Sequence, residues 1–319
     1  MGRRPLSRKE EELAGPKRVH NQTMIVDSFF SIALLAATLT VEIRQPVDDQ
    51  KAAELTEWVQ TTADTIELVY GRFPNPKAKV IVIPSSENSW GSDAPVIFGR
   101  VTRRDGETVE LFVDPERPIE DFYTDWTATH EFSHLMMPLL SQRYRWISEG
   151  FATYYQNILM SRAQRYTPEL AWQRLSEGFV RGQESRPDLS PNAAAAGGIR
   201  HARMKVYWSG AAIALKADIT LRQRSNGAES LDRVLGQLQA CCLPSGRRWS
   251  GPQLFKKLDT FIESPVFMPL YRKYADEEGF PDIARLLSDL GIETNPDGTV
   301  SLDDGKTLAS IRKAISDPQ

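Results

Sequence analysis

Cysteine and histidine are scarce in this sequence, and neither sign of charge dominates it. Its 319 residues include two cysteines and four histidines, and 39 Lys and Arg residues stand against 42 Asp and Glu residues. Two cysteines are too few for a disulfide scaffold or for a zinc site of four thiolates. The near balance of charge argues against a nucleic-acid-binding protein that relies on bulk charge. With 41% hydrophobic and 25% charged residues, the composition is that of a globular protein with room for two domains.

The two cysteines, Cys241 and Cys242, are adjacent in the sequence. Adjacent cysteines rarely bridge each other, because the ring that they close is strained. We therefore expect an unbridged, buried pair of small apolar side chains, with palmitoylation or a redox role as the alternative.

Long apolar runs are also rare, and the main one lies near the start of the chain. It extends from Ser28 to Val41 and follows a segment, residues 1–20, with six Lys or Arg against three Glu. This order is typical of a signal peptide or a short membrane anchor, so residues 1–45 are expected to hold one and residues 24–43 to associate with a membrane. The protein is then periplasmic, secreted or membrane-anchored. Alternatively, the run is a buried helix or a first strand, and the protein is cytoplasmic.

Hydrophobic spacing predicts one helix, then strands, then a series of helices. Apolar residues at three-four spacing indicate the helices, and short β-branched runs indicate the strands. Asp105 and Gly106 are typical of a hairpin turn. The expected elements are a helix over Asp48–Tyr70, strands over Lys79–Ile83, Val96–Thr102 and Glu107–Val113, and helices over Ile119–Met137, Ser148–Arg162 and Pro168–Arg181.

A stretch rich in Pro, Ala and Gly, Glu184–Gly198, follows these elements and is typical of a linker. Beyond it, the spacing predicts helices over Lys205–Gln223, Ser230–Gln239, Pro252–Ile262 and Pro265–Glu277. The sequence therefore predicts an α+β domain over residues 46–184 and an all-helical domain over residues 185–319.

Two of the four histidines lie in the sequence His-Glu-Phe-Ser-His at residues 130–134. On a helix, His130 and His134 share a face, so both imidazoles can reach one metal ion while Glu131 projects beside them. Neutral imidazole suits zinc, and a catalytic zinc ion takes three protein ligands and keeps one position for water. Glu131 is then the general base and acid. The alternative is a helix with two surface histidines.

Glu149 is the candidate third ligand. It lies 15 residues after His134, which leaves room for a turn and the start of an antiparallel helix. No histidine lies six to eight residues beyond His134, so the pattern of three-histidine zinc proteases is absent. The alternative for Glu149 is a glutamate near a helix N-terminus that complements the helix dipole.

The H-E-F-S-H sequence, followed by W-I-S-E-G-F-A-T-Y-Y, resembles the gluzincin metallopeptidases of the MA-like class, in particular the glycyl aminopeptidase branch and its short relatives. The resemblance continues in Tyr207–Ala211 (Y-W-S-G-A), Asp218–Arg222 (D-I-T-L-R) and Ser230–Asp232 (S-L-D), and it covers roughly residues 122–290. It implies a zincin-like catalytic domain, with a small β-sheet and the H-E-x-x-H helix, followed by the helical domain.

The resemblance also implies roles for individual residues. His130, His134 and Glu149 would hold one zinc ion, Glu131 would act as general base and acid, and Tyr207 would stabilise the oxyanion. The helical domain would thus supply the catalytic tyrosine to a peptidase that acts on a peptide or protein. His201 is a second candidate for the oxyanion role, and the alternative for Tyr207 is a core aromatic residue.

The sequence departs from that group in the stretch before the H-E-x-x-H motif. The residues near 96–113 lack the glycine-rich motif with a glutamate that binds the substrate amino terminus, and Glu110 reads as an outward strand charge. Endopeptidase and exopeptidase modes both stay open. A catalytically weak or inactive scaffold protein of the cell envelope is the alternative, although all four metal-site positions are intact. Arg143 and Arg145, and similarly Arg247 and Arg248, either contact an acidic substrate or coat a loop, and a solvated loop is favoured.

Overall fold

The computed structural model of the protein describes residues 39–85 and 93–318. Most of the predicted signal or anchor, residues 24–43, lies outside these residues. The end of the apolar run belongs to the folded domain, because Thr40–Ile43 forms the strand β1. Within the described ranges, no helix has both the length and the apolar character needed to cross a membrane.

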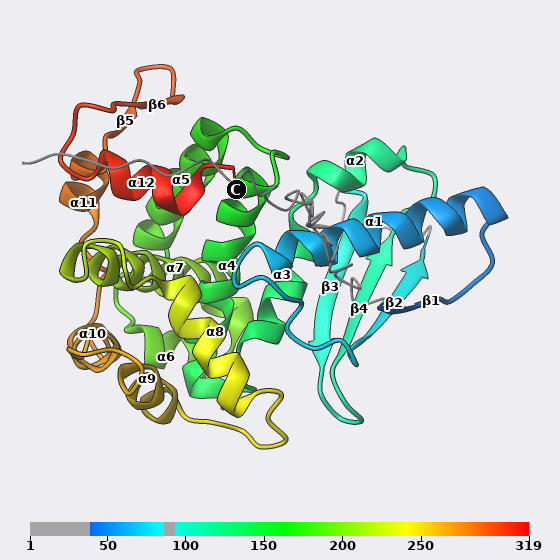
Figure 1. Ribbon diagram of the computed structural model, residues 1–319, viewed down its shortest axis with the longest axis horizontal. Helices are drawn as coiled ribbons and strands as arrows, with labels where there is room; N and C mark the ends of the chain where they lie inside the picture. Colours follow the sequence, from blue (N-terminus) through cyan, green and yellow to red (C-terminus); the bar gives the residue numbers. More distant parts are fainter. Residues whose placement is uncertain (1–38, 86–92, 319) are drawn as a thin grey trace, which may run out of the picture. The chain divides into compact units, whose positions relative to one another are not determined.

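A four-stranded sheet forms one side of the molecule (Figure 1). It consists of β1, β2 (Lys79–Pro84), β4 (Thr108–Val113) and β3 (Val96–Thr102), in that spatial order. The first three strands are parallel, and β3 pairs antiparallel with β4 as the edge strand. The three strands expected from the sequence are therefore confirmed, and β1 is an additional one.

The helix α1 (Asp49–Glu67) crosses the strands of this sheet in Figure 1. Its start is as predicted, since the Asp48 side chain accepts a hydrogen bond from the backbone N–H of Lys51 at 2.7 Å. Its buried face includes Leu55, Val59 and Ile66, which join the same hydrophobic core as the strand residues. The helix thereby covers one face of the sheet.

The prediction of one continuous helix over Ile119–Met137 is wrong, because the structure divides this stretch into three elements. The structure has α2 (Ile119–Thr124), α3 (Thr127–Ser133) and a 3₁₀ turn, η1 (His134–Met136). Asp125 breaks the helix because its backbone is extended and its carboxylate accepts the N–H of Thr127 at 2.7 Å, a local bond that competes with helical pairing. His130 lies in α3, and His134 opens η1 with helical backbone angles.

Two long helices, α4 (Arg145–Arg162) and α7 (Ile199–Arg224), pack against each other next to α5 (Pro168–Glu184). Their backbones meet at Gly150 and Gly210. A Cβ atom on Gly150 would lie 2.2 Å from the Cα of Gly210, and one on Gly210 would lie 1.9 Å from the carbonyl oxygen of Trp146. The glycine of the Y-W-S-G-A motif is thus required by the contact between the two helices.

The stretch expected as a linker is a structured part of the fold, so that prediction is wrong. It contains α6 (Pro191–Ala196), which begins after an N-cap at Ser190. Asn192 is buried and accepts a hydrogen bond from the indole N–H of Trp146 in α4 at 2.9 Å. A Ser-Pro helix start followed by four alanines forms a short helix that packs closely, because alanine has high helix propensity and little bulk. The domain boundary at residue 184 stays a prediction.

The C-terminal part is helical except for one hairpin, and the expected α+β class is confirmed. Its elements are α8 (Leu231–Cys242), α9 (Gly251–Asp259), α10 (Phe267–Tyr274), α11 (Ala284–Asp289), β5 (Ile292–Thr294), β6 (Val300–Leu302) and α12 (Ala309–Ser316). The description of this part as all-helical therefore needs correction. Strands of three residues, such as β5 and β6, are too short to give an alternating pattern in the sequence.

Cys241 and Cys242 form a disulfide with each other, and neither is buried. The prediction of an unbridged, buried pair is wrong on both counts. The pair lies at the C-terminal end of α8, where the backbone leaves the helix for the extended residue Leu243. The helix therefore constrains the backbone before the pair but not the backbone after it.

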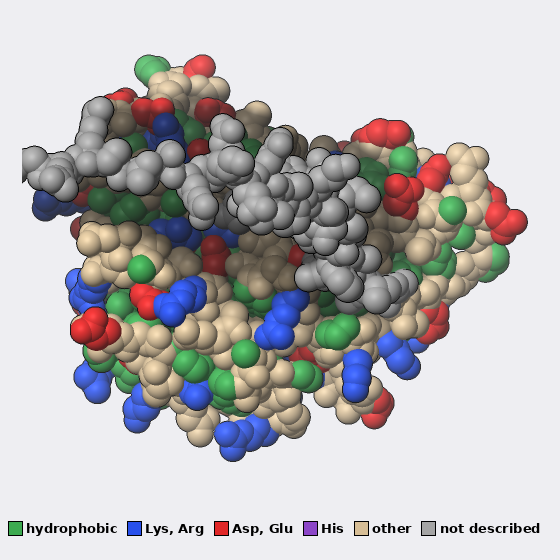
Figure 2. All heavy atoms as spheres, in the orientation of Figure 1, with side chains coloured by type: hydrophobic (Ala, Val, Ile, Leu, Met, Phe, Trp, Pro, Cys, Tyr) green, Lys and Arg blue, Asp and Glu red, His purple; other side chains and the backbone are tan. Residues whose placement is uncertain are grey.

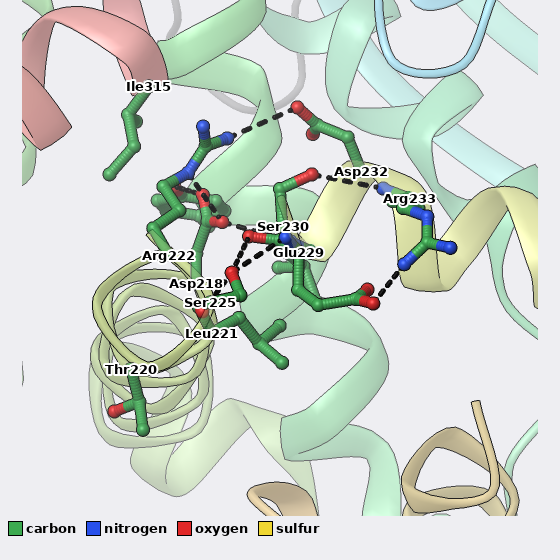
Figure 3. A network of polar contacts seen from close by, with 12 residues as sticks. Asp218, Thr220, Leu221, Arg222, Ser225, Glu229, Ser230, Asp232, Arg233 and Ile315 are labelled. Atoms are coloured by element: carbon green, nitrogen blue, oxygen red, sulfur yellow. Dashed lines mark hydrogen bonds and ion pairs between the residues drawn. The ribbon is translucent and has the colours of Figure 1, made fainter. Parts of the chain in front are cut away.

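The D-I-T-L-R and S-L-D motifs lie in a buried polar network between α7 and α8 (Figure 3). Asp218 accepts hydrogen bonds from the Arg222 guanidinium and from the backbone N–H of Leu231, both at 2.9 Å. The other carboxylate oxygen of Asp218 accepts the hydroxyl of Tyr154, from α4, at 2.8 Å. Asp218 therefore holds three helices in register.

Asp232 is the centre of the second half of this network. It accepts hydrogen bonds from the Tyr155 hydroxyl at 2.8 Å and from the fully buried Arg162 guanidinium at 2.9 Å. Arg162 also donates to the carbonyl of Ile315 in α12 at 2.7 Å. A buried guanidinium is tolerated only when it is paired in this way. These motif residues hold the helices behind the cleft described below, and none of them lines it.

Candidate metal centre

Three side chains predicted as metal ligands meet at one point between α3, η1 and α4. The Nε2 atoms of His130 and His134 lie 3.5 and 3.4 Å from the same carboxylate oxygen of Glu149. Candidate ligand atoms of all three residues lie within 4.8 Å of one another, and all three side chains are buried. Among the described residues on the face drawn in Figure 2, no histidine side chain reaches the surface.

Each histidine is oriented by a hydrogen bond at its other ring nitrogen. The Nδ1 atom of His130 lies 2.7 Å from the Gln156 side-chain oxygen, and the Nδ1 atom of His134 lies 3.0 Å from the Ser148 hydroxyl. The Gln156 oxygen only accepts, so the Nδ1 atom of His130 donates to it and the Nε2 atom faces Glu149. Partners of this kind fix the tautomer and ring orientation of metal ligands.

The donor set fits a zinc ion. Two imidazole nitrogens and one carboxylate oxygen are the ligands of one class of catalytic zinc site, which keeps a further position for water. The orienting bonds from Gln156 and Ser148 supply the outer shell that such sites need.

Glu149 carries a negative charge at this point. Burial by itself raises its pKa, but the adjacent His134 and hydrogen bonds with both histidines outweigh burial, so the pKa of Glu149 lies well below its usual range. Arg145, one turn earlier on α4, donates to the other carboxylate oxygen at 3.1 Å. Glu149 is therefore an ionised ligand with both oxygens engaged.

Glu131 lies beside the three ligands, against the edge strand. A Cβ atom on Gly99 of β3 would lie 2.5 Å from the Cγ of Glu131, so only glycine leaves room for this side chain. Burial raises the pKa of Glu131, and the nearby His134 and His130 offset part of that rise. A carboxyl group with a raised pKa can both take up and release a proton near neutral pH.

Tyr207 reaches the same point from α7. Its ring stacks on that of His130, with centroids 5.7 Å apart and planes at 10°. Burial, together with the charges of Glu149 and Glu131, raises the pKa of Tyr207. The structure thus brings Tyr207 to the candidate ligands. It does not bring His201 there, because that side chain is exposed and does not line the cleft.

A cleft passes through this site and extends to both sides of it. The part on the His134 side has a volume of about 1470 Å³, and the part on the His130 side has a volume of about 710 Å³. Both parts share Gly99, Glu131 and Tyr207 in their walls. The Glu110 carboxylate lies outside the cleft lining, on β4, and pairs with Arg100, in agreement with an outward strand charge.

Sequence reasoning missed the residues that support the site. Gln156 lies seven residues after Glu149, a spacing that places both on one helix face and that could have revealed it. Arg103 gave no such signal. It pairs with Glu107 at 2.8 Å and donates to the backbone carbonyl of His134 at 2.7 Å, so it fixes η1 to the β3–β4 hairpin.

No protein-family model and no curated protein matches the sequence. Among solved structures, an aminopeptidase N family protein from Idiomarina loihiensis is similar, with a TM-score of 0.56 and 14% identity over 81% of this chain and 48% of that chain. An M1 zinc metallopeptidase from Deinococcus radiodurans has a TM-score of 0.47 and 15% identity, over 75% of this chain and 48% of that one. This chain thus spans about half the length of both. The first similarity confirms the fold implied by the gluzincin resemblance.

Proposed function

We propose that this protein is a zinc-dependent metallopeptidase that hydrolyses peptide bonds in a peptide or protein substrate. The observation that carries the proposal is the convergence of the His130 and His134 Nε2 atoms on one oxygen of Glu149, with Glu131 and Tyr207 facing the same cleft. The fold shared with an aminopeptidase N family protein supports it.

Glu131 and Tyr207 carry the protein's own part of the reaction. A zinc ion held by His130, His134 and Glu149 would lower the pKa of a water molecule toward about 7 and polarise the substrate carbonyl. Glu131 takes the proton of the attacking water and passes it to the leaving amine, a transfer that its raised pKa favours.

Tyr207 donates a hydrogen bond to the oxygen on which negative charge develops. Its raised pKa keeps the phenol protonated at the pH of the reaction, so that it can act as a donor. The stacking of its ring on His130 fixes the hydroxyl before the substrate binds.

Substitution of the proposed base tests this function. We expect Glu131→Gln to bind one equivalent of zinc, as the unchanged protein does, and to lose cleavage of a peptide library. Glu120→Gln is the matched control, because Glu120 is exposed on α2 and lies outside the cleft lining. Undiminished cleavage by Glu131→Gln, or a zinc-loaded wild-type protein that cleaves no peptide in the library, would overturn the proposal.

A further inference from the structure

We propose that the His134 side of the cleft selects acidic peptides, so that the protein cleaves bonds next to aspartate and glutamate side chains. The inference rests on the proposed peptidase function and adds the class of substrate. The walls on this side contain two carboxylates, Glu131 and Glu149, both at the metal centre. They also contain six arginines, namely Arg100, Arg103, Arg145, Arg200, Arg203 and Arg248.

Three of these arginines already have partners. Arg100 pairs with Glu110, Arg103 pairs with Glu107, and Arg145 donates to Glu149. The charges of these three arginines are balanced within the protein, so we assign them no part in attracting a ligand.

The other three, Arg200, Arg203 and Arg248, are exposed and have no ion pair or hydrogen bond with the residues that the structure describes. They come from two distant segments, the first turns of α7 and the loop before α9, and meet on one side of the cleft. Arg203 lies one turn before Tyr207 on α7, and both residues line this side of the cleft.

The His130 side of the cleft differs. Its arginines include Arg181, which pairs with Glu177 at 3.7 Å and lies over the ring of Trp208, and Arg174, which lies over the ring of Tyr166. Asp125 and Glu177 add negative charge there. Arg203 lines this side as well, but Arg200 and Arg248 do not, so most of the unpaired positive charge among the described residues of the cleft lies on the His134 side.

On the face drawn in Figure 2, Lys and Arg side chains lie scattered among other side chains. Unpaired like charges on one wall repel one another, and an anion between them removes this repulsion. Guanidinium groups bind carboxylates in a planar, bidentate geometry, so aspartate and glutamate side chains match the unpaired arginines.

A matched set of blocked peptides tests the inference. Each peptide has both termini capped and carries Asp or Glu at one position, and its partner carries Asn or Gln there. We expect wild-type protein to cleave the acidic peptide about tenfold more efficiently, in kcat/KM, when the acidic residue lies on one side of the cleaved bond. We also expect this ratio to fall as salt is added. Equal cleavage of both peptides would overturn the inference.

Variants assign the preference to the three arginines. We expect the ratio to approach one in the triple variant Arg200→Gln, Arg203→Gln, Arg248→Gln, and to stay at its wild-type value in Arg285→Gln, which removes an exposed charge on α11. The single charge reversal Arg203→Glu is expected to favour a lysine peptide over its glutamine partner, a gain that misfolding cannot produce. A triple variant that keeps the wild-type ratio would contradict the proposal.

Binding to Glu131→Gln separates this inference from the proposed function. Fluorescence anisotropy with the same peptides is expected to show tighter binding of the acidic one by Glu131→Gln, whether or not wild-type protein cleaves it. Tighter binding without any cleavage would refute the peptidase and leave the acidic preference standing. Tighter binding of single-stranded RNA than of the acidic peptide would overturn the preference itself.

Discussion

Gly150 of α4 and Gly210 of α7 touch backbone to backbone, with space for no side chain at either position. Glu149 is the residue before Gly150, and Tyr207 lies one turn before Gly210. The contact therefore sets how far the proposed oxyanion donor stands from the third candidate ligand. A glycine pair of this kind determines the geometry of the site without facing the substrate.

This contact predicts the effect of adding one methyl group. We expect Gly210→Ala to push α7 away from α4, to lower the free energy of unfolding by about 1–3 kcal/mol through overpacking, and to lower kcat more than it changes zinc affinity. Thermal unfolding, peptide kinetics and zinc titration measure the three effects. Gly246→Ala is the control, because nothing lies within 4 Å of a Cβ atom there. A Gly210→Ala protein with wild-type stability would show that the helices separate without cost.

The hydrogen bond between Gln156 and His130 predicts a change in metal affinity. Without the side-chain oxygen of Gln156, His130 loses the partner that fixes its tautomer, and we expect Gln156→Leu to weaken zinc binding roughly 10- to 100-fold. Competition with a chromogenic chelator measures the affinity. Gln156→Glu keeps an acceptor and is expected to retain tight binding. The control Gln50→Leu changes an exposed glutamine on α1. Equal affinity in Gln156→Leu and wild-type protein would exclude the orienting role.

The ligand residues could be predicted from the sequence because their geometry is local. His130 and His134 share a helix face through a four-residue spacing, and that relation survives although Asp125 breaks the helix before them. Glu149 could be proposed because only a short connection separates it from His134. Tyr207 can be predicted only through the family resemblance, since no local pattern links it to Glu149, which lies 58 residues earlier.

Other features depend on tertiary contacts and left no readable pattern. The sequence around Arg248 predicts only a solvated loop, because nothing in this segment shows that Arg200 and Arg203 line the same cleft. The segment around Asn192 looked like a linker, because its composition hides a short helix whose buried amide binds Trp146.

The buried network predicts a large loss of stability when one partner is removed. Arg162→Leu leaves the largely buried carboxylate of Asp232 with Arg222, at 3.4 Å, as its one cationic partner among the described residues. We expect a loss of about 3–5 kcal/mol in the free energy of unfolding, measured by chemical denaturation. Arg186→Leu breaks the exposed pair between Arg186 and Asp188 and is expected to lower the free energy of unfolding far less, because water screens an exposed ion pair. Similar losses in the two variants would mean that the network stabilises no more than a surface pair.

Zinc is expected to stabilise the fold, because its candidate ligands come from separate elements, α3, η1 and α4. A ligand at 100 times its dissociation constant adds about 2.7 kcal/mol to the free energy of unfolding when it binds only the folded state. Adding zinc to chelator-treated protein should therefore raise the melting temperature, measured by scanning calorimetry. Glu149→Gln should lose most of this increase, since an amide replaces the ionised ligand, whereas Glu131→Gln should keep it, since Glu131 acts on the substrate side. A zinc-dependent increase of equal size in Glu149→Gln would remove Glu149 from the ligand set and leave His130 and His134 as the only protein ligands supported by the geometry.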